Sequence, residues 1–443
     1  YIIENKKSFP DLIGEDQTVD QNALNNYILE YSRTYRRGQN DPEILRPATM
    51  NQNQVKPTVK VFIENSGSMD GYVKGTTEFE ASLSDLLVQI QYHYDKENLK
   101  VNFVNTKVYP STVSEVKDFV EALEPDKAPY KVGDRSVSKL NEILKMILDS
   151  TDQETVSILV SDCIYSLEPD KDTEGALEFQ KSLTKGAFLE KSKDFDFSTV
   201  VVKMSSKFNG KYWKKDNSSE QLSNVERPFY IWIMGANAYV NRFYELIKTN
   251  ELKGYQHSYY LSTNGKAKLP YYTVLSETNR QGNFKNADRG QKNITSIMEL
   301  KYDNGKIQLA IAIDLSGIPV ESSYLMNPNN YNVPEGYEIV SVEGVNRNKI
   351  TQRDFITIEK STASHIITVS HSNKYTVQDL SISLSNQIPQ WVEETSSMDD
   401  RTILDQLDKT FGLEYLVKGV TEAYITQRPE RNSYLTIIID IKN

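Results

Sequence analysis

The stretch that decides the fold reads Val61-Phe62-Ile63-Glu64-Asn65-Ser66-Gly67-Ser68-Met69. Its apolar first part predicts a buried strand, which ends in a carboxylate and two hydroxyls at the alternate positions 64, 66 and 68. Such oxygen ligands suit a hard divalent cation, because Mg²⁺ takes about six oxygens at roughly 2.0–2.1 Å. Gly67 lets the backbone turn tightly between the two serines. The stretch therefore indicates a strand followed by a candidate metal-binding loop.

Strands and helices alternate from residue 58 to about residue 250. The predicted strands are 59–63, 101–108, 156–160, 197–204 and 229–234, and the predicted helices are 79–94, 113–123, 137–148, 173–191 and 236–247. Alternation of this kind is typical of a parallel sheet with helices on both faces. We therefore expect an α/β fold with a doubly wound, mostly parallel sheet. Between its last two strands, Asn209-Gly210 predicts the turn of a projecting hairpin.

The hydrophobic pattern changes to a period of two after about residue 251. The predicted strands there are 256–262, 270–275, 307–313, 336–343, 353–358, 365–370, 378–384 and 435–441. Their spacing predicts a β-rich, sandwich-like C-terminal domain. Apolar residues from Ile403 to Tyr424 add one late helix, which can break at Gly412.

Residues 1–57 combine four prolines with many polar side chains, a composition typical of an arm or linker. Inside it, apolar residues at three- and four-residue steps over 23–35 predict one amphipathic helix. The expected organisation is thus an arm (1–57), an α/β domain (58–250) and a C-terminal domain (251–443). The chain starts at Tyr1, so we expect a native N-terminus to have been removed, either as a signal peptide or by trimming. This expectation favours an exported or cell-envelope protein, with the cytoplasm as the alternative.

Composition excludes several classes of function. A formal net charge of −10 argues against a phosphate-binding surface, so no nucleic-acid partner is expected. The basic cluster Lys211, Lys214 and Lys215 around Trp213 is more typical of a solvated hairpin tip. The single Cys163 excludes an internal disulfide framework and a cysteine-based zinc site. No apolar run reaches the ~18 residues that a transmembrane helix needs.

A second acidic loop follows the predicted strand 156–160, at Ser161-Asp162. In an open parallel sheet, ligands bind beyond the carboxyl ends of the strands, where neighbouring loops converge. We therefore expect Asp162 to lie at the same edge of the sheet as Glu64, Ser66 and Ser68. The plainer interpretation is a strand-to-helix turn in which Ser68 or Asp70 caps the following helix.

With these two loops, residues 58–250 resemble the von Willebrand factor A domain family. The family's metal-ion-dependent adhesion site has Asp-x-Ser-x-Ser after the first strand, a Thr or Ser in a middle loop, and an Asp after a later buried strand. Its Ser-Gly-Ser-Met form stands here at Ser66-Gly67-Ser68-Met69. The resemblance implies that Ser66 and Ser68 are direct ligands, that Asp162 binds directly or through water, and that Ser136 is the middle ligand, with Asp134 as the competitor.

Two positions depart from the family pattern. Glu64 stands where Asp is usual, and the extra methylene moves the carboxylate by about 1.3 Å, whereas metal–oxygen distances tolerate only about ±0.2 Å. Glu64 must therefore bind in another geometry, through water, or not at all. Cys163 follows Asp162 where Gly is common, which removes backbone freedom beside a ligand.

The resemblance implies a non-enzymatic protein-interaction or adhesion module. Its cation would be Mg²⁺ or Mn²⁺, with Ca²⁺ also compatible, and a partner protein would supply an Asp or Glu carboxylate as the last ligand. The alternative is a structural subunit of an assembly, with a degenerate metal-free site and binding through the C-terminal β domain. A metal-dependent hydrolase would need a further base or a second metal near Asp162, and the sequence indicates neither.

Overall fold

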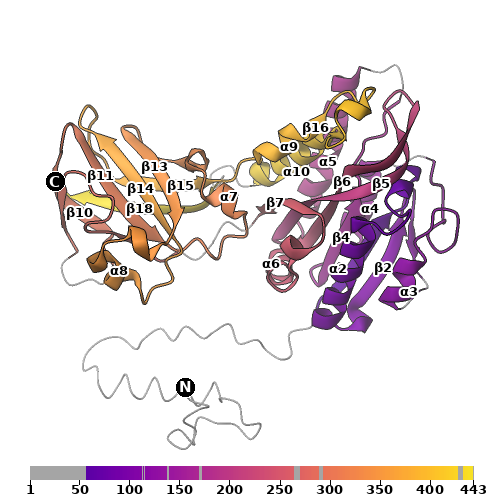
Figure 1. The fold of residues 1–443 in the computed structure, drawn as a ribbon, viewed down its shortest axis with the longest axis horizontal. Coiled ribbons are helices and arrows are strands. Elements are labelled where there is room, and N and C mark those ends of the chain that lie inside the picture. The colour runs from indigo at the N-terminus through magenta and orange to yellow at the C-terminus, as the bar shows by residue number, and fades with distance from the viewer. Residues whose placement is uncertain are drawn as a thin grey trace, which may run out of the picture. The chain divides into compact units, whose positions relative to one another are not determined.

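The computed structural model describes residues 56–111, 113, 115–136, 139–168, 172–263, 270–288, 293–427 and 433–442. The chain divides into two units, Tyr1–Lys56 and Pro57–Asn443. The helix predicted over 23–35 lies outside the described residues. The second unit contains a large sheet flanked by helices and two smaller sheets that pack on each other (Figure 1).

The large sheet has seven strands in the order β3-β2-β1-β4-β6-β5-β7. They are β1 (Thr58–Glu64), β2 (Leu99–Val104), β3 (Val108–Pro110), β4 (Thr155–Ser161), β5 (Phe197–Trp213), β6 (Ser219–Ala236) and β7 (Tyr255–Ser262). The prediction of an α/β fold is confirmed at this level. Parallel pairing joins β1 to β2 and β4, whereas β3, β6, β5 and β7 are added antiparallel.

Helices cover both faces of this sheet because side chains alternate along its strands. On β1, Val59, Val61 and Ile63 face the helices α2 (Glu78–Tyr94) and α6 (Asn237–Leu246). Phe62 faces the opposite way, in the core that contains α4 (Leu140–Asp149) and α5 (Thr173–Lys191). The predicted helix 113–123 forms only as α3 (Val116–Glu121). The two carboxylate-bearing loops follow β1 and β4, which are neighbours at the centre of the sheet.

The predicted hairpin is present as the long ribbon β5–β6, but its predicted turn is wrong. The chain turns at residues 214–218, where Lys214 N donates to Ser218 O, and Gly210 lies inside β5 beside a bulge. Gly210 is needed there for close approach, since a Cβ on it would lie 2.8 Å from the Gly71 Cα. Asn-Gly therefore marks a backbone contact in this chain, and not the hairpin turn.

The segment after residue 388 returns to the α/β core. It forms α9 (Gln390–Glu394), the short strands β16 (Ser396–Ser397) and β17 (Thr410–Phe411), and α10 (Leu413–Gln427). Trp391, Phe411 and Leu416 share a buried cluster with the α5 face of the sheet, and α10 lies beside α5 (Figure 1). The late helix begins after Gly412, whose φ of +78° favours glycine. Residues 391–424, predicted as part of the C-terminal domain, thus pack with the α/β region.

The remaining strands form two sheets that share one core. One sheet has the order β12-β15-β18-β10-β9 and the other has the order β13-β14-β11-β8. The strands are β8 (Tyr272–Val274), β9 (Asn283–Asn286), β10 (Ser296–Lys301), β11 (Lys306–Ile313), β12 (Tyr331–Asn332), β13 (Tyr337–Gly344), β14 (His365–Ser372), β15 (Leu380–Ser385) and β18 (Ser433–Lys442). Pairing in them is antiparallel except between β10 and β18.

One predicted strand of this region is a helix. Residues 353–358 form most of α8 (Gln352–Ile358), and Thr351 caps it by accepting a hydrogen bond from Asp354 N. The Thr-x-x-Asp spacing is a helix-start signal that outweighs the β-branched residues after it. None of the helices in the described ranges is both long and apolar enough to cross a membrane.

Candidate functional site

A buried cluster of oxygens lies at the carboxyl ends of β1 and β4. Glu64 ends β1, and its two carboxylate oxygens accept hydrogen bonds from Ser66 Oγ at 2.7 Å and from Ser161 Oγ at 2.5 Å. Ser66 Oγ in turn lies 3.0 Å from Ser68 Oγ. Glu64 is only 1% exposed and Ser66 is 4% exposed. The strand-end loop thus folds back, so that its hydroxyls meet the carboxylate of its own strand.

Asp162 completes this cluster from the loop after β4. Its Oδ1 accepts a hydrogen bond from Ile164 N at 3.2 Å, and Ser68 also hydrogen-bonds to its side chain. Its Oδ2 is buried and has no hydrogen-bond partner among the described residues. Burial, followed by the negative charge of Glu64, raises the pKa of Asp162 to about 7, against the lowering effect of the Ser68 hydrogen bond. Asp162 therefore carries one unsatisfied oxygen on a side chain that Ser68 contacts.

The structure brings together Glu64, Ser66, Ser68 and Asp162, whereas Ser136 hydrogen-bonds to Asp134 through its backbone N and its hydroxyl. Ser136 is exposed, and its hydroxyl donates to Asp134 Oδ1 at 2.6 Å. The middle loop does reach the cluster through its backbone, since Gly67 N donates to Arg135 O at 3.0 Å. Loop placement was thus predictable, whereas the choice of Ser136 as a ligand gains no support from this geometry.

Arg135, which sequence reasoning did not single out, contacts the candidate ligand loop. Its Nε donates to Asn65 O at 2.5 Å, and its guanidinium pairs with Asp70 and lies 5.0 Å from the centre of the Tyr130 ring. Burial raises the pKa of Asp70, and the charge of Arg135 opposes that shift. Arg135 therefore ties the middle loop to the candidate ligand loop from both sides of Gly67.

Cys163 occupies the left-handed backbone region that its position requires, with φ +55°. A non-glycine residue there costs on the order of 1 kcal/mol. Cys163 N donates to Ser161 Oγ at 2.8 Å, and its sulfur accepts a hydrogen bond from Trp232 Nε1 at 3.2 Å. Burial raises the pKa of the thiol. These contacts hold the turn after Asp162 without glycine.

Arg227, on β6, places a buried positive charge near the cluster. Its Nη1 donates to Leu407 O and Lys409 O at 2.7 and 2.8 Å, and its guanidinium lies over the Tyr212 ring. Its Nε and Nη2 are buried and have no hydrogen-bond partner among the described residues. Arg227 is close enough to lower the pKa of Asp162. Sequence reasoning missed Arg227, because it lies just before the predicted strand 229–234, in a segment expected to belong to a projecting hairpin.

The ribbon β5–β6 covers the candidate ligand loop. Gly67–Gly71 form a short 3₁₀ helix, and Gly71 packs against Phe208 and Gly210 of β5. Trp213 Nε1 lies 3.6 Å from where a Cβ on Gly67 would be. Gly67 and Ser68 nevertheless remain partly exposed. Solvent can therefore reach the loop at Gly67 and Ser68, whereas the carboxylates lie beneath it.

We expect Gly210→Ala to destabilise the protein by about 2 kcal/mol, because its methyl group would meet the Gly71 backbone at 2.8 Å. Urea unfolding measures the change. The matched control is Gly344→Ala, where an added Cβ meets nothing within 4 Å. Equal unfolding midpoints for the two variants would show that β5 does not pack closely against the loop at Gly71.

The donor set fits a cation only if hydroxyls take part. Within the described ranges, no three His, Cys, Asp or Glu side chains converge to hold a metal ion. Two carboxylates and two serine hydroxyls do converge, and one carboxylate oxygen has no partner in the described part of the chain. Hard cations such as Mg²⁺ accept such oxygens and keep part of their water shell.

The known proteins were compared with the chain in three ways. No family model matches it, and neither the curated proteins nor the solved structures contain a match.

Proposed function

We propose that this chain is a non-enzymatic protein-interaction module that holds a divalent cation, Mg²⁺ or Mn²⁺, at Ser66, Ser68 and Asp162. The observation that carries the proposal is Asp162 Oδ2, which is buried and has no hydrogen-bond partner among the described residues, on a side chain that Ser68 contacts. A buried carboxylate oxygen left without a partner costs on the order of 1–3 kcal/mol. A cation removes that cost and also screens the repulsion between Asp162 and Glu64.

The hydrogen bonds of Glu64 suggest how the proposed site tolerates the longer side chain. Both of its carboxylate oxygens already accept hydroxyl protons, from Ser66 and Ser161. A serine that donates its proton keeps its oxygen lone pairs for a second partner. In the proposal, Glu64 therefore orients Ser66 toward the ion and does not bind the ion itself, as outer-shell carboxylates do in other metal sites.

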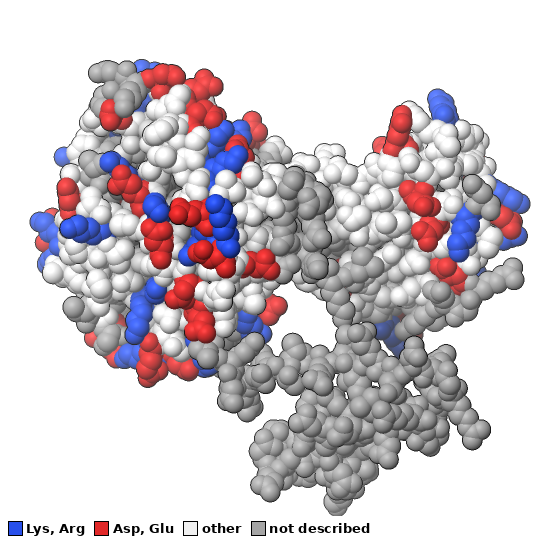
Figure 2. Space-filling view, turned by 180° about the vertical axis from the view of Figure 1, so that it is seen from behind, with Lys and Arg blue, Asp and Glu red and all other residues white. Residues whose placement is uncertain are grey.

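A partner carboxylate would complete the coordination from the solvent side, where Gly67 and Ser68 are partly exposed. On the face drawn in Figure 2, Lys and Arg side chains are interspersed with Asp and Glu, and no extended basic area is visible. This pattern supports a protein partner more than a nucleic acid. A hydrolytic role would need a free base beside Asp162, whereas both oxygens of Glu64, its carboxylate neighbour, are engaged.

A second candidate function is a metal-free structural subunit that binds through the C-terminal β sheets. The observation that favours it is Arg227, whose guanidinium already supplies a buried positive charge near Asp162. In that case the ribbon and Arg227 keep the cluster closed, and the carboxylates share a proton.

Calorimetric titration with MnCl₂ at pH 8 separates the two candidates. We expect wild type to bind one ion, Asp162→Ala to lose binding, and Ser68→Ala to bind at least about tenfold more weakly, since a ligand is lost. Ser136→Ala is the matched serine control and should bind like wild type, because Ser136 is exposed and bonded to Asp134. Absence of heat from wild type would remove the cation and favour the metal-free subunit.

A further inference from the structure

A separate pocket of about 820 Å³ lies between α6, β7 and the segment 316–323. The pocket belongs to the unit Pro57–Asn443. Hydrogen bonds between Glu321 and β7 hold the segment 316–323 against the strand. Glu321 accepts from Ser258 N at 2.5 Å and from Tyr255 Oη at 2.9 Å. This volume falls within the range of small-ligand sites, roughly 300–1,000 Å³. The candidate cation loop does not line it.

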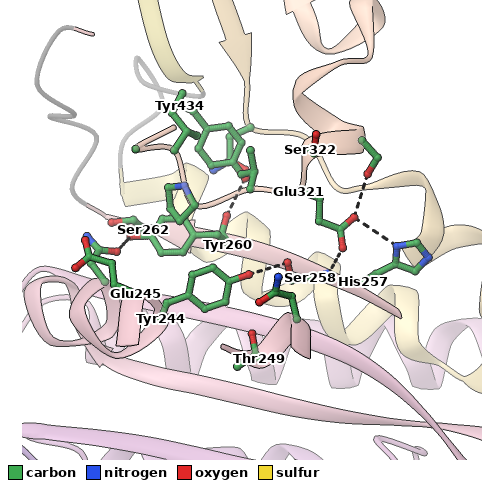
Figure 3. Close-up of a pocket in the computed structure, with 18 of the residues that line it drawn as sticks. Tyr244, Glu245, Thr249, His257, Ser258, Tyr260, Ser262, Glu321, Ser322 and Tyr434 are labelled. Carbon is green, nitrogen blue, oxygen red and sulfur yellow. Dashed lines mark hydrogen bonds and ion pairs between the residues drawn. The ribbon is translucent and has the colours of Figure 1, made fainter. Parts of the chain in front are cut away.

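Tyrosines from different elements line the pocket, and their hydroxyls are tied down. Tyr244 Oη lies 3.0 Å from Ser258 Oγ, and Tyr434 Oη donates to Tyr260 O at 2.8 Å. Tyr260 Oη donates to Asn237 and Asn241 at 3.0 and 2.6 Å. Figure 3 shows Tyr244 and Tyr434 on either side of Tyr260. The rings are therefore fixed before any ligand arrives, which lowers the entropy cost of binding.

The lining carries Lys248 and two glutamates that already have partners in the protein. Glu321 lies 3.4 Å from His257 Nδ1, and Glu245 pairs with Arg242 at 3.3 Å. Burial alone would raise the pKa of Glu321, but its hydrogen bonds with His257, Ser258 and Tyr255 lower it. In Figure 3, Glu321 and His257 lie at one end of the drawn residues and Glu245 at the other, with the tyrosines between them. Between these two ends the lining includes tyrosine rings, amides and hydroxyls.

We propose that this pocket binds a neutral saccharide of one or two rings. The apolar faces of sugar rings pack on tyrosine rings, which combine an apolar body with a polar tip. Sugar hydroxyls can use the second hydrogen-bonding positions of Asn241 and Ser258, whose first positions are taken by Tyr260 and Tyr244. A charged ligand would meet side chains of both signs, Glu245, Glu321 and Lys248, and an apolar ligand would leave the remaining hydrogen-bonding capacity of the lining unused. The proposal does not depend on the cation.

Saturation-transfer NMR on the whole chain tests this, with maltose, lactose, cellobiose and chitobiose each at about 10 mM, enough to detect millimolar binding. Gly317→Trp is the blocking variant, because Gly317 lines the pocket and an added Cβ there meets nothing within 4 Å. Gly344→Trp is its matched control, since Gly344 is equally open and lies outside the pocket. Tyr244→Ala removes one ring.

We expect at least one sugar to receive saturation from wild type and from Gly344→Trp. Gly317→Trp and Tyr244→Ala should lower its affinity by about tenfold or more, with melting temperatures showing that both variants fold. Absence of transfer to all four sugars overturns the proposal, as does transfer that survives Gly317→Trp. Transfer to uridine but to none of the sugars would also overturn it, because the rings would then select a planar ligand.

Discussion

Asp354→Ala should lower the free energy of unfolding by about 4 kcal/mol. Asp354 is 1% exposed, and its carboxylate accepts hydrogen bonds from the segment 276–278, which is distant in the sequence. It accepts hydrogen bonds from Ser276 N, Glu277 N and Thr278 N at 2.7–2.9 Å, and from the hydroxyl of Thr278 at 2.8 Å. Hydrogen bonds to a charged group contribute about 1.5–3 kcal/mol each, and alanine leaves all these donors unpaired at once.

The effect of Asp354 should depend on pH. Burial by itself raises the pKa of Asp354, but the donors of Thr278, Glu277 and Ser276 outweigh it, so the pKa lies below the ordinary 3.8. A depressed pKa adds stability that is present above pH 3.8 and is lost as the pH falls through the folded-state value. Urea unfolding at pH 7 and at pH 3 should therefore show a smaller difference between wild type and variant at pH 3.

The control for Asp354→Ala is Glu359→Ala, at the exposed C-terminal end of the same helix. An exposed substitution of this kind should stay within about 0.5 kcal/mol of wild type. Equal free energies of unfolding for the two variants would show that the Asp354 carboxylate does not stabilise the segment 276–278. Its hydrogen bonds would then not explain the lowered pKa of Asp354.

The sequence predicted correctly those helices and strands whose hydrophobic spacing and caps lie within the element itself. Helix α5 spans Thr173–Lys191, the range expected from its spacing, and Asp172 caps it by accepting from Gly175 N. The period of two located β11 and β14. The strand predicted over 353–358 failed because its β-branched residues suit a strand, whereas the Thr351 cap and the buried Asp354 hold a helix. Long-range hydrogen bonds of Asp354 are invisible in a local window.

Long-range packing also explains the errors in topology. Asn209-Gly210 has the composition of a turn, yet Gly210 is required by Gly71, which is distant in the sequence. Likewise Phe411 and Leu416 read as part of a C-terminal domain, although their apolar partners lie on the α/β region. A single sequence shows that such residues will be buried, but it does not show against what.

The candidate site was predictable where it depends on strand ends. Ser66, Ser68 and Asp162 follow β1 and β4, and parallel pairing of these strands brings their loops together. Arg135 and Arg227 were missed because their side chains reach the site from a loop and a ribbon whose paths the sequence does not define. Ser136 lies in the expected loop, but its hydroxyl turns to Asp134.

In EDTA, wild type should lose stability on the order of 4 kcal/mol as the pH rises from about 4 to about 8, and Asp162→Asn should remove most of that loss. Burial, and then the charge of Glu64, raises the pKa of Asp162 from 3.8 to about 7 in the folded protein. The folded state then binds more protons than the unfolded state across this range, so raising the pH favours unfolding. A shift of about three units corresponds to about 4 kcal/mol.

Urea unfolding at several pH values measures this difference, with Asp118→Asn on the exposed face of α3 as the matched control.

If a cation replaces the proton, MgCl₂ at pH 8 should restore about 2.7 kcal/mol to wild type at a hundred times its Kd, and nothing to Asp162→Asn. Restoration in both proteins would place the ion elsewhere. A steep pH dependence without any effect of Mg²⁺ or Mn²⁺ would mean that Asp162 carries a proton at low pH, and that the buried charge of Arg227 supplies a counter-charge when it ionises.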